Sequence, residues 1–195
     1  MIWWMILLAV NLVGFLSVWL GSRLGAGTDS RGLRIFWVIL SLLGGSVGAA
    51  SALLIFNRRT NKANMMFWVF EICLWIVQMV VLLYALGFHR PAFVWNPIPF
   101  FAGKRWFLVW LAFINLLTFA MFGVDKFCAI RQKSRIRITT LLALSFCGGS
   151  VGGILGMILF RHKIRKSYFA VGLPLILCTQ AIVMLYAANF AWQSI

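Results

Sequence analysis

Charge is scarce in this sequence, and negative charge most of all. Aspartate and glutamate together occur three times in 195 residues, and all charged residues make up 11% of the chain. Because a soluble globular domain carries about 25% charged residues, this chain cannot cover itself with polar surface. Its hydrophobic content of 63% and mean hydropathy of +0.98 exclude an ordinary soluble domain and indicate that lipid surrounds most of it.

Catalytic and metal-binding motifs are also missing. No C-x-x-C spacing occurs among Cys73, Cys128, Cys147 and Cys178. We therefore expect neither a metal site nor a disulfide. The sequence has no H-E-x-x-H, no paired carboxylates and no phosphate loop followed by G-K-S/T. We expect no cofactor and no catalytic residue, and an enzyme is less expected than a binding protein. One enzymatic arrangement stays open, in which His162 and Asp125 process a phosphorylated lipid.

Long apolar stretches are what the chain does have. A helix that crosses a membrane needs about 20 apolar residues. Six stretches fit this requirement, five of them without any charge and the third with Glu71 alone: 1–22, 35–57, 63–89, 106–124, 138–160 and 167–195. The sequence therefore predicts an all-α, polytopic integral membrane protein.

The basic residues point to the membrane surface. Eighteen lysines and arginines give a net charge of +15, and they lie in short loops beside the apolar stretches. Basic residues in such loops set the orientation of the helices and attract anionic headgroups. No nucleic-acid-binding motif accompanies them, so we expect anionic membrane lipids as partners and no nucleic acid.

The sequence repeats itself at an offset of 104 residues. Residues 7–62 and 111–166 align without a gap and share fifteen identities, which include GGSVG at Gly44–Gly48 and at Gly148–Gly152. A match of this length indicates the duplication of one three-segment unit.

The repeat predicts the domain organisation. We expect a first membrane repeat in residues 1–89 and a second in residues 106–195. Residues 90–105 hold three of the four prolines and several aromatic residues. Because proline disrupts helices, we expect this linker to be a loop with little regular structure.

The second half resembles a known family. Its segments VDKFCAIRQKSRIRI, GGSVGG and RHKIRKSYF are similar to those of a small bacterial inner-membrane family classed as a domain of unknown function. The members carry an Asp-Lys pair, then GGS-x-G, then an HK-x-x-K run. The resemblance covers residues 107–187 and is weak in the first half, where Gly21-Ser22 replaces Asp125-Lys126. It implies a compact, multi-pass protein of the bacterial inner (cytoplasmic) membrane, and no activity.

Two topologies fit the GGSVG segments. In one, each segment is a spanning helix of comfortable length, the chain crosses six times, and the glycines let helices pack closely. In the other, each segment is a re-entrant hairpin centred on GGSVG, where glycines permit a tight turn, and four spans remain. Six spans divide the basic residues ten to eight between the two sides of the membrane, whereas hairpins divide them fifteen to three, and orientation normally follows such an asymmetry. In either case the structural glycines are Gly44, Gly45, Gly48, Gly148, Gly149 and Gly152.

A dense cationic run after the second GGSVG segment forms the candidate binding site. In the hairpin topology this run converges with other basic residues beside Asp125, and such a cluster would hold a phosphate through charge-assisted hydrogen bonds. The same run would also serve as a plain orientation signal. The candidate headgroup-binding residues are Arg161, His162, Lys163, Arg165, Lys166, Lys126 and Arg135.

Three polar residues are candidates for coupling or for a polar path. Asp125 ends a long apolar helix, where an ion pair with nearby cations would staple the fold, or where the carboxyl would carry a proton. Asn11 and Asn115 recur at matching positions, either to hydrogen-bond between helices or to line a path.

Glu71 is a further candidate of the same kind. It lies within an apolar stretch, and intramembrane carboxylates are functional candidates by default. We expect it to be protonated, or paired with Arg58 or Arg59. The residue 104 positions further on is Leu175, so Glu71 is not part of the repeated core.

The expected function is binding or transport of an anionic, phosphate-bearing lipid or small solute. The chain is short for a complete transporter, so a homodimer or a larger complex is plausible. The alternative is a non-catalytic membrane subunit that packs against a partner protein through its glycine-rich helix faces.

Overall fold

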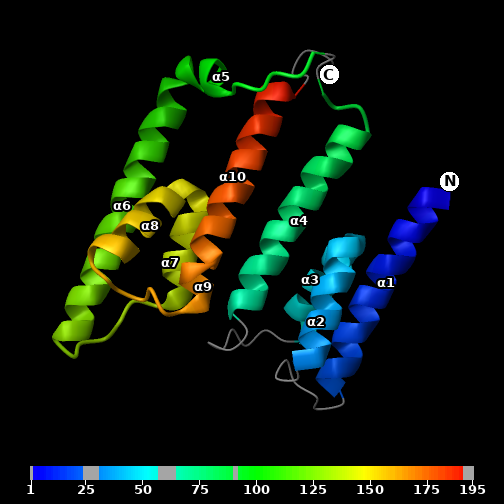
Figure 1. The fold of residues 1–195 in the computed structure, drawn as a ribbon, viewed down its shortest axis with the longest axis horizontal. Coiled ribbons are helices and arrows are strands. Elements are labelled where there is room, and N and C mark those ends of the chain that lie inside the picture. The colour runs from blue at the N-terminus through cyan, green and yellow to red at the C-terminus, as the bar shows by residue number, and fades with distance from the viewer. Residues whose placement is uncertain (1, 24–30, 57–64, 90–91, 191–195) are drawn as a thin grey trace. The chain divides into compact units, whose positions relative to one another are not determined.

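The computed structural model describes residues 2–23, 31–56, 65–89 and 92–190, and these contain helices and turns but no strand. The predicted all-α class is confirmed for them. The chain divides into two compact units, residues 1–82 (unit 1) and 83–195 (unit 2), coloured blue to green and green to red in Figure 1. The helices are α1 (Ile2–Arg23), α2 (Arg31–Leu40), α3 (Ser46–Phe56), α4 (Met65–Ala85), α5 (Ile98–Ala102), α6 (Arg105–Ile130), α7 (Ile138–Leu144), α8 (Ser150–Leu159), α9 (Ser167–Ala170) and α10 (Gly172–Asn189).

Four helical segments are long and apolar enough to cross a membrane. They are Met65–Ala85, Arg105–Ile130, Ile138–Leu159 and Ser167–Asn189. Large apolar side chains point outward from them, and Leu116 and Leu159 are each 69% exposed. Helices with such an exposed apolar surface indicate a membrane protein, in which lipid takes the place of a polar surface.

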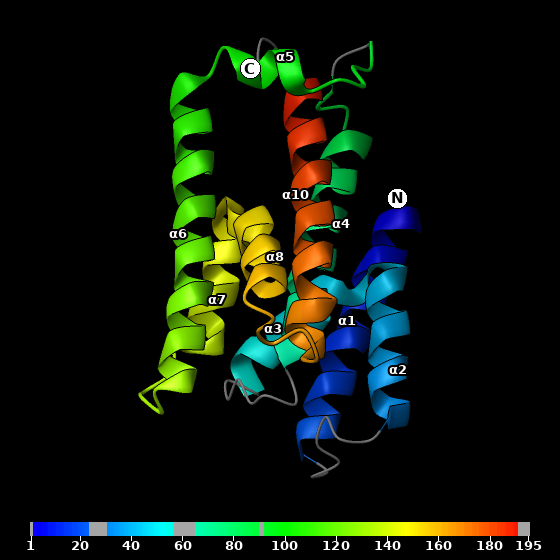
Figure 2. The ribbon, with the colours of Figure 1, turned by 60° about the vertical axis from the view of Figure 1, so that its left-hand side comes forward.

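Each GGSVG sequence interrupts a helix. A π-type turn, Ser41–Gly45, separates α2 from α3, and a second, Ser145–Gly149, separates α7 from α8. Within these turns Gly44 has φ 109° and Gly148 has φ 116°, values that glycine adopts without the strain of a side chain. Ile138–Leu159 is therefore not one straight helix, and the chain changes direction between α7 and α8 (Figure 2).

The other glycines of the motif allow a close approach of backbones. A Cβ atom on Gly152 would lie 2.0 Å from the carbonyl oxygen of Asn115 in α6, and one on Gly48 would lie 1.9 Å from that of Asn11 in α1. Thus α8 packs on α6, and α3 on α1, at a distance that only glycine permits. The glycine faces are buried within each unit.

The linker is more ordered than its composition suggests. Pro97 caps the short helix α5, and a second proline stands in the first turn, where a missing N–H costs nothing. Asn189 at the end of α10 ties the linker down, since its amide donates to the carbonyl of Val94 at 2.9 Å and its Oδ1 accepts the N–H of Val94 at 2.6 Å. The predicted loop with little regular structure thus contains the five-residue helix α5, and the linker lies in unit 2.

Candidate functional site

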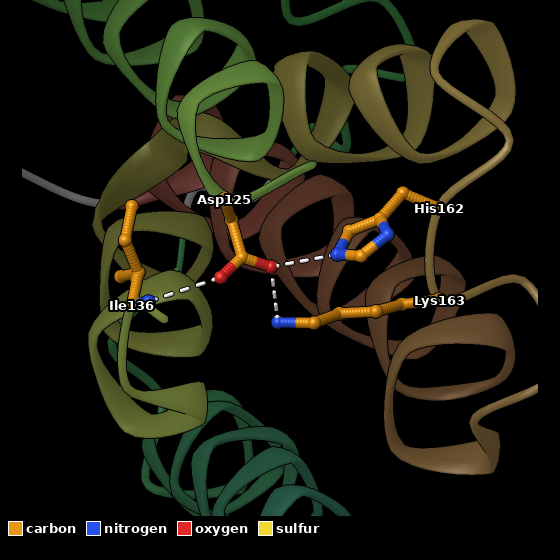
Figure 3. Close-up of polar contacts among 4 residues, drawn as sticks. All are labelled: Asp125, Ile136, His162 and Lys163. Carbon is orange, nitrogen blue, oxygen red and sulfur yellow. Dashed lines mark hydrogen bonds and ion pairs between the residues drawn. The ribbon is translucent and has the colours of Figure 1, made fainter. Parts of the chain in front are cut away.

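A buried carboxylate organises one end of unit 2. Asp125, in the last turns of α6, is 0% exposed. Its Oδ2 lies 2.8 Å from Nε2 of His162 and 2.6 Å from Nζ of Lys163, while its Oδ1 accepts the backbone N–H of Ile136 at 3.0 Å (Figure 3). Lys163 also lies over the ring of Phe169, 5.0 Å from its centre. We call this arrangement the Asp125 staple.

The turn after α8 directs two basic side chains toward this carboxylate. The N–H of His162 bonds the carbonyl of Met157 and the N–H of Arg161 bonds that of Ile158, which is the Schellman pattern of a helix end. Its left-handed position is occupied by Arg161, with φ 43°, and Lys163 follows with φ 62°. The chain reverses at these residues, so His162 and Lys163 turn inward while their neighbours face outward.

The staple joins both ends of the GGSVG segment of unit 2. Ile136 precedes α7 and His162 follows α8, yet both contact the same carboxyl group. A straight helix of 22 residues would be about 33 Å long. The two ends of Ile138–Leu159 therefore lie at the same end of the unit.

The staple also divides the predicted headgroup-binding residues into two groups. His162 and Lys163 are engaged by Asp125, and their side chains are 14% and 13% exposed. The other five lie around the same end of the unit and form no ion pair among the described residues; Arg135, Arg161, Arg165 and Lys166 are exposed and Lys126 is half-buried.

Polar side chains fill the helix break of unit 2. Asn115 of α6 donates to the carbonyl of Gly148 at 2.9 Å and accepts the N–H of Gly152 at 2.7 Å. Gln180 of α10 donates to the carbonyl of Ser145 at 2.7 Å and accepts the hydroxyl of Ser150. These bonds satisfy backbone groups that the break releases, as a lipid environment requires.

The break of unit 1 is filled in the same way. Asn11 donates to the carbonyl of Gly44 and accepts the N–H of Gly48, each at 2.9 Å. Gln78 of α4 donates to the carbonyl of Ser41 at 2.6 Å and accepts the hydroxyl of Ser46. Both predicted asparagines therefore bond between helices.

The two glutamines are not among the residues predicted from the repeat at offset 104. Gln78 and Gln180 are 102 residues apart, so the match at offset 104 conceals them. At offset 102, residues 65–88 and 167–190 share eight identities, among them Tyr84 with Tyr186. The repeat at offset 102 is therefore the sequence signal that identifies Gln78 and Gln180 as matching residues.

The shorter offset also changes which residue of unit 2 corresponds to Glu71. Leu173, and not Leu175, occupies the matching place, because Leu173 lies beside Ser145 at Gly153 as Glu71 lies beside Ser41. The Ser41 hydroxyl donates to Oε1 of Glu71 at 2.6 Å, and Glu71 is 0% exposed. The suggested partners Arg58 and Arg59 lie outside the described residues.

The chemistry of the Asp125 staple is that of an ion pair. His162 and Lys163 share one oxygen of Asp125, and the backbone N–H of Ile136 occupies the other, so the carboxyl group makes three contacts within the unit. This geometry restrains the turn between α8 and α9. The basic side chains that face outward around the staple are the ones that remain able to contact a ligand.

Comparisons with known proteins identify the second unit. A family model described as "Protein of unknown function (DUF1294)" matches residues 115–169, which include Asp125, the second GGSVG and the basic run. "Uncharacterized protein YsdA" of Bacillus subtilis (strain 168) is 39% identical over 75 residues, which cover 38% of this chain and 84% of that protein. No solved structure matches. The chain therefore belongs to the bacterial family of proteins of unknown function that includes YsdA.

Proposed function

We propose that this membrane protein binds, and in its assembled form transports, an anionic, phosphate-bearing lipid or small solute at the basic end of unit 2. The observation that carries this proposal is the excess of cations around the Asp125 staple. One buried carboxylate is shared there by a histidine and a lysine, while eight further basic residues lie in the same two loops or at their edges: Lys126, Arg131, Lys133, Arg135, Arg137, Arg161, Arg165 and Lys166.

Arg161 is the strongest candidate for direct contact. It occupies a left-handed backbone position, φ 43°, which costs about 1–2 kcal/mol for a residue other than glycine. Its exposed side chain has no ion-pair partner among the described residues. The turn that brings His162 and Lys163 to Asp125 leaves the Arg161 side chain facing outward, and a guanidinium binds a phosphate with two parallel hydrogen bonds.

The placement in the membrane is part of the proposal. With both ends of Ile138–Leu159 beside Asp125, α7 and α8 form a re-entrant hairpin, and α6 and α10 are the spans of unit 2. The matching break in unit 1 supports the same plan there, and hence two fused copies with four spans. The basic end then faces the cytoplasm of a bacterial cytoplasmic (inner) membrane.

The glycine contacts do not favour the alternative of a subunit that packs through its glycine faces. Gly48 and Gly152 contact α1 and α6 of their own units, so these faces are already covered. A homodimer or larger complex would use other surfaces.

Native mass spectrometry of the purified protein tests the binding site. Arg161→Gly relieves the left-handed strain and removes the charge, so we expect higher thermal stability together with about fivefold weaker retention of phosphatidylglycerol, since one basic residue contributes about 1 kcal/mol. Lys104→Gln, at the opposite end of α6, is the matched control and should retain the lipid. Equal retention by both variants contradicts the proposal. Added inorganic phosphate that displaces the lipid would indicate a soluble phosphate ligand.

Cysteine labelling tests the topology. In a variant without the native cysteines, Ser134→Cys and Arg165→Cys occupy exposed positions on either side of the GGSVG segment. We expect an impermeant thiol reagent to modify both from the same side, and Trp95→Cys in the linker from the other side. Labelling of positions 134 and 165 from opposite sides would establish a spanning helix.

A further inference from the structure

Buried polar atoms without a partner are concentrated in unit 1. Among the described residues, the atoms of this kind are Nε1 of Trp37, Nε1 of Trp68 and Oε2 of Glu71. Trp37 is 2% exposed and Glu71 is 0% exposed. Leaving such an atom unpaired costs about 1–3 kcal/mol. Three in one unit therefore require an explanation beyond folding.

Unit 2 builds the same break without any of these atoms. Leu141 stands at the position that matches Trp37 at offset 104. At offset 102, Ala170 matches Trp68 and Leu173 matches Glu71. Leu141 and Leu173 are both 0% exposed, so apolar residues fill these places well. The polar set of unit 1 is dispensable for the hairpin itself.

The two tryptophans each lie one helical turn before one side of the Ser41–Glu71 hydrogen bond. Glu71 follows Trp68 by one turn of α4, and Ser41 follows Trp37 by one turn at the end of α2. Trp37 and Trp68 belong to one buried apolar cluster, in which the rings of Trp37 and Phe67 are 5.8 Å apart. Ser41 donates to Oε1 of Glu71, whereas Ser145 of unit 2 donates to the carbonyl of Leu141.

We propose that Glu71 is a proton-binding site, present in unit 1 and absent from unit 2. As a neutral acid, Glu71 presents Oε1 as the acceptor that Ser41 satisfies, and Oε2 becomes the hydroxyl oxygen. As a carboxylate, Oε2 would be a buried charged oxygen without a donor. A proton needs no cavity, which suits a fully buried side chain. Uptake and release of this proton change the charge at the hairpin break by one.

The surroundings of Glu71 supply no counter-charge among the described side chains. Among the described side chains of α1, α2, α3 and the turn Ser41–Gly45 none is titratable, and the neighbouring titratable residue on α4 is Cys73. The side chains of Arg23, Arg31 and Arg34, on α1 and α2, lie outside the described ones. The proposal stands independently of anion binding at unit 2, because it rests on different residues.

Infrared spectroscopy of the full-length protein in lipid nanodiscs tests the site. We expect a protonated-carboxyl C=O band at neutral pH that shifts in D2O, declines as the pH is raised, and is lost completely in Glu71→Gln. Glu71→Leu, which copies unit 2, should also lose the band while keeping the fold. Asp125→Asn is the matched control and should retain it.

Three outcomes would overturn the proposal. Absence of the band at neutral pH would mean that Glu71 is ionised. A band that neither shifts in D2O nor changes with pH would mark a buried acid that exchanges no proton. Loss of the band on addition of sodium at constant pH would mean that a metal cation occupies the carboxyl group instead.

Discussion

The helix breaks of unit 1 and unit 2 share their neutral contacts and differ in their charged ones. In both, an asparagine bridges the break and a glutamine and a serine satisfy the freed backbone. Among the described residues, a carboxylate that contacts a lysine and a histidine occurs in unit 2 alone, and Gly21 is the match of this Asp125 in unit 1. Conversely, a lone buried carboxyl occurs in unit 1, where unit 2 has Leu173.

The neutral contacts, which both units share, build the fold. The charged groups, which occur in one unit each, are additional to it. Backbone groups in lipid need partners wherever the helix breaks, so the neutral contacts must occur in each unit. A charged group carries a desolvation cost that no helix break requires. The residues that occur in one unit alone are therefore the better candidates for function.

Removal of the Asp125 staple should have the largest effect. Asp125→Ala leaves Lys163 and His162 without their anion, and breaking a buried ion pair costs about 3–5 kcal/mol. Denaturant unfolding in detergent micelles measures this loss. Lys126→Gln, one residue further on, should change the stability by less than about 0.5 kcal/mol. Equally small effects of Asp125→Ala and Lys126→Gln on the free energy of unfolding would mean that the Asp125 staple does not stabilise unit 2.

The glycine contacts should be equivalent in the two units. Gly152→Ala and Gly48→Ala each place a methyl group against a backbone carbonyl, and overpacking costs about 1–3 kcal/mol. Gly103→Ala is the control, because nothing lies within 4 Å of its Cβ position. Thermal unfolding compares the three variants, and a tolerated alanine at only one of the two crossings would break the equivalence.

The glutamines should have intermediate effects. Gln180→Leu and Gln78→Leu remove matching hydrogen bonds to the broken helix, with an expected cost of about 1 kcal/mol each. The same unfolding assay applies. A clear loss in one unit and none in the other would show that the break is held differently in each.

Replacement of Glu71 should have the smallest effect on stability. Glu71→Leu reproduces the residue of unit 2, and Ser41 is then free to bond back within its own helix as Ser145 does. We expect a change within about 0.5 kcal/mol, or a gain. A large loss of stability would mean that Glu71 builds the fold of unit 1.

The sequence predicts those parts of the fold that depend on composition and local chemistry. Scarce charge and long apolar stretches predict a helical membrane protein, and consecutive glycines mark the break at Gly148. In one of the two topologies left open, the hairpin, the sequence also brings Asp125 and the basic run together. It does not show which cations turn inward, because that depends on the left-handed conformation of Arg161. Nor does it reveal Ile136, which acts through its backbone N–H and has no side-chain signature.

The Asp125 staple has a consequence for the way the protein is made. His162 follows Asp125 by 37 residues, so the ribosome completes α6, α7 and α8 before either basic partner of Asp125 exists. The contacts that join the two ends of Ile138–Leu159 at Asp125 are therefore completed only when the turn after α8 has been synthesised. A nascent chain arrested before His162 would hold Asp125 without either of its two basic partners. We expect the proteases of cellular quality control to recognise such a chain as incompletely folded.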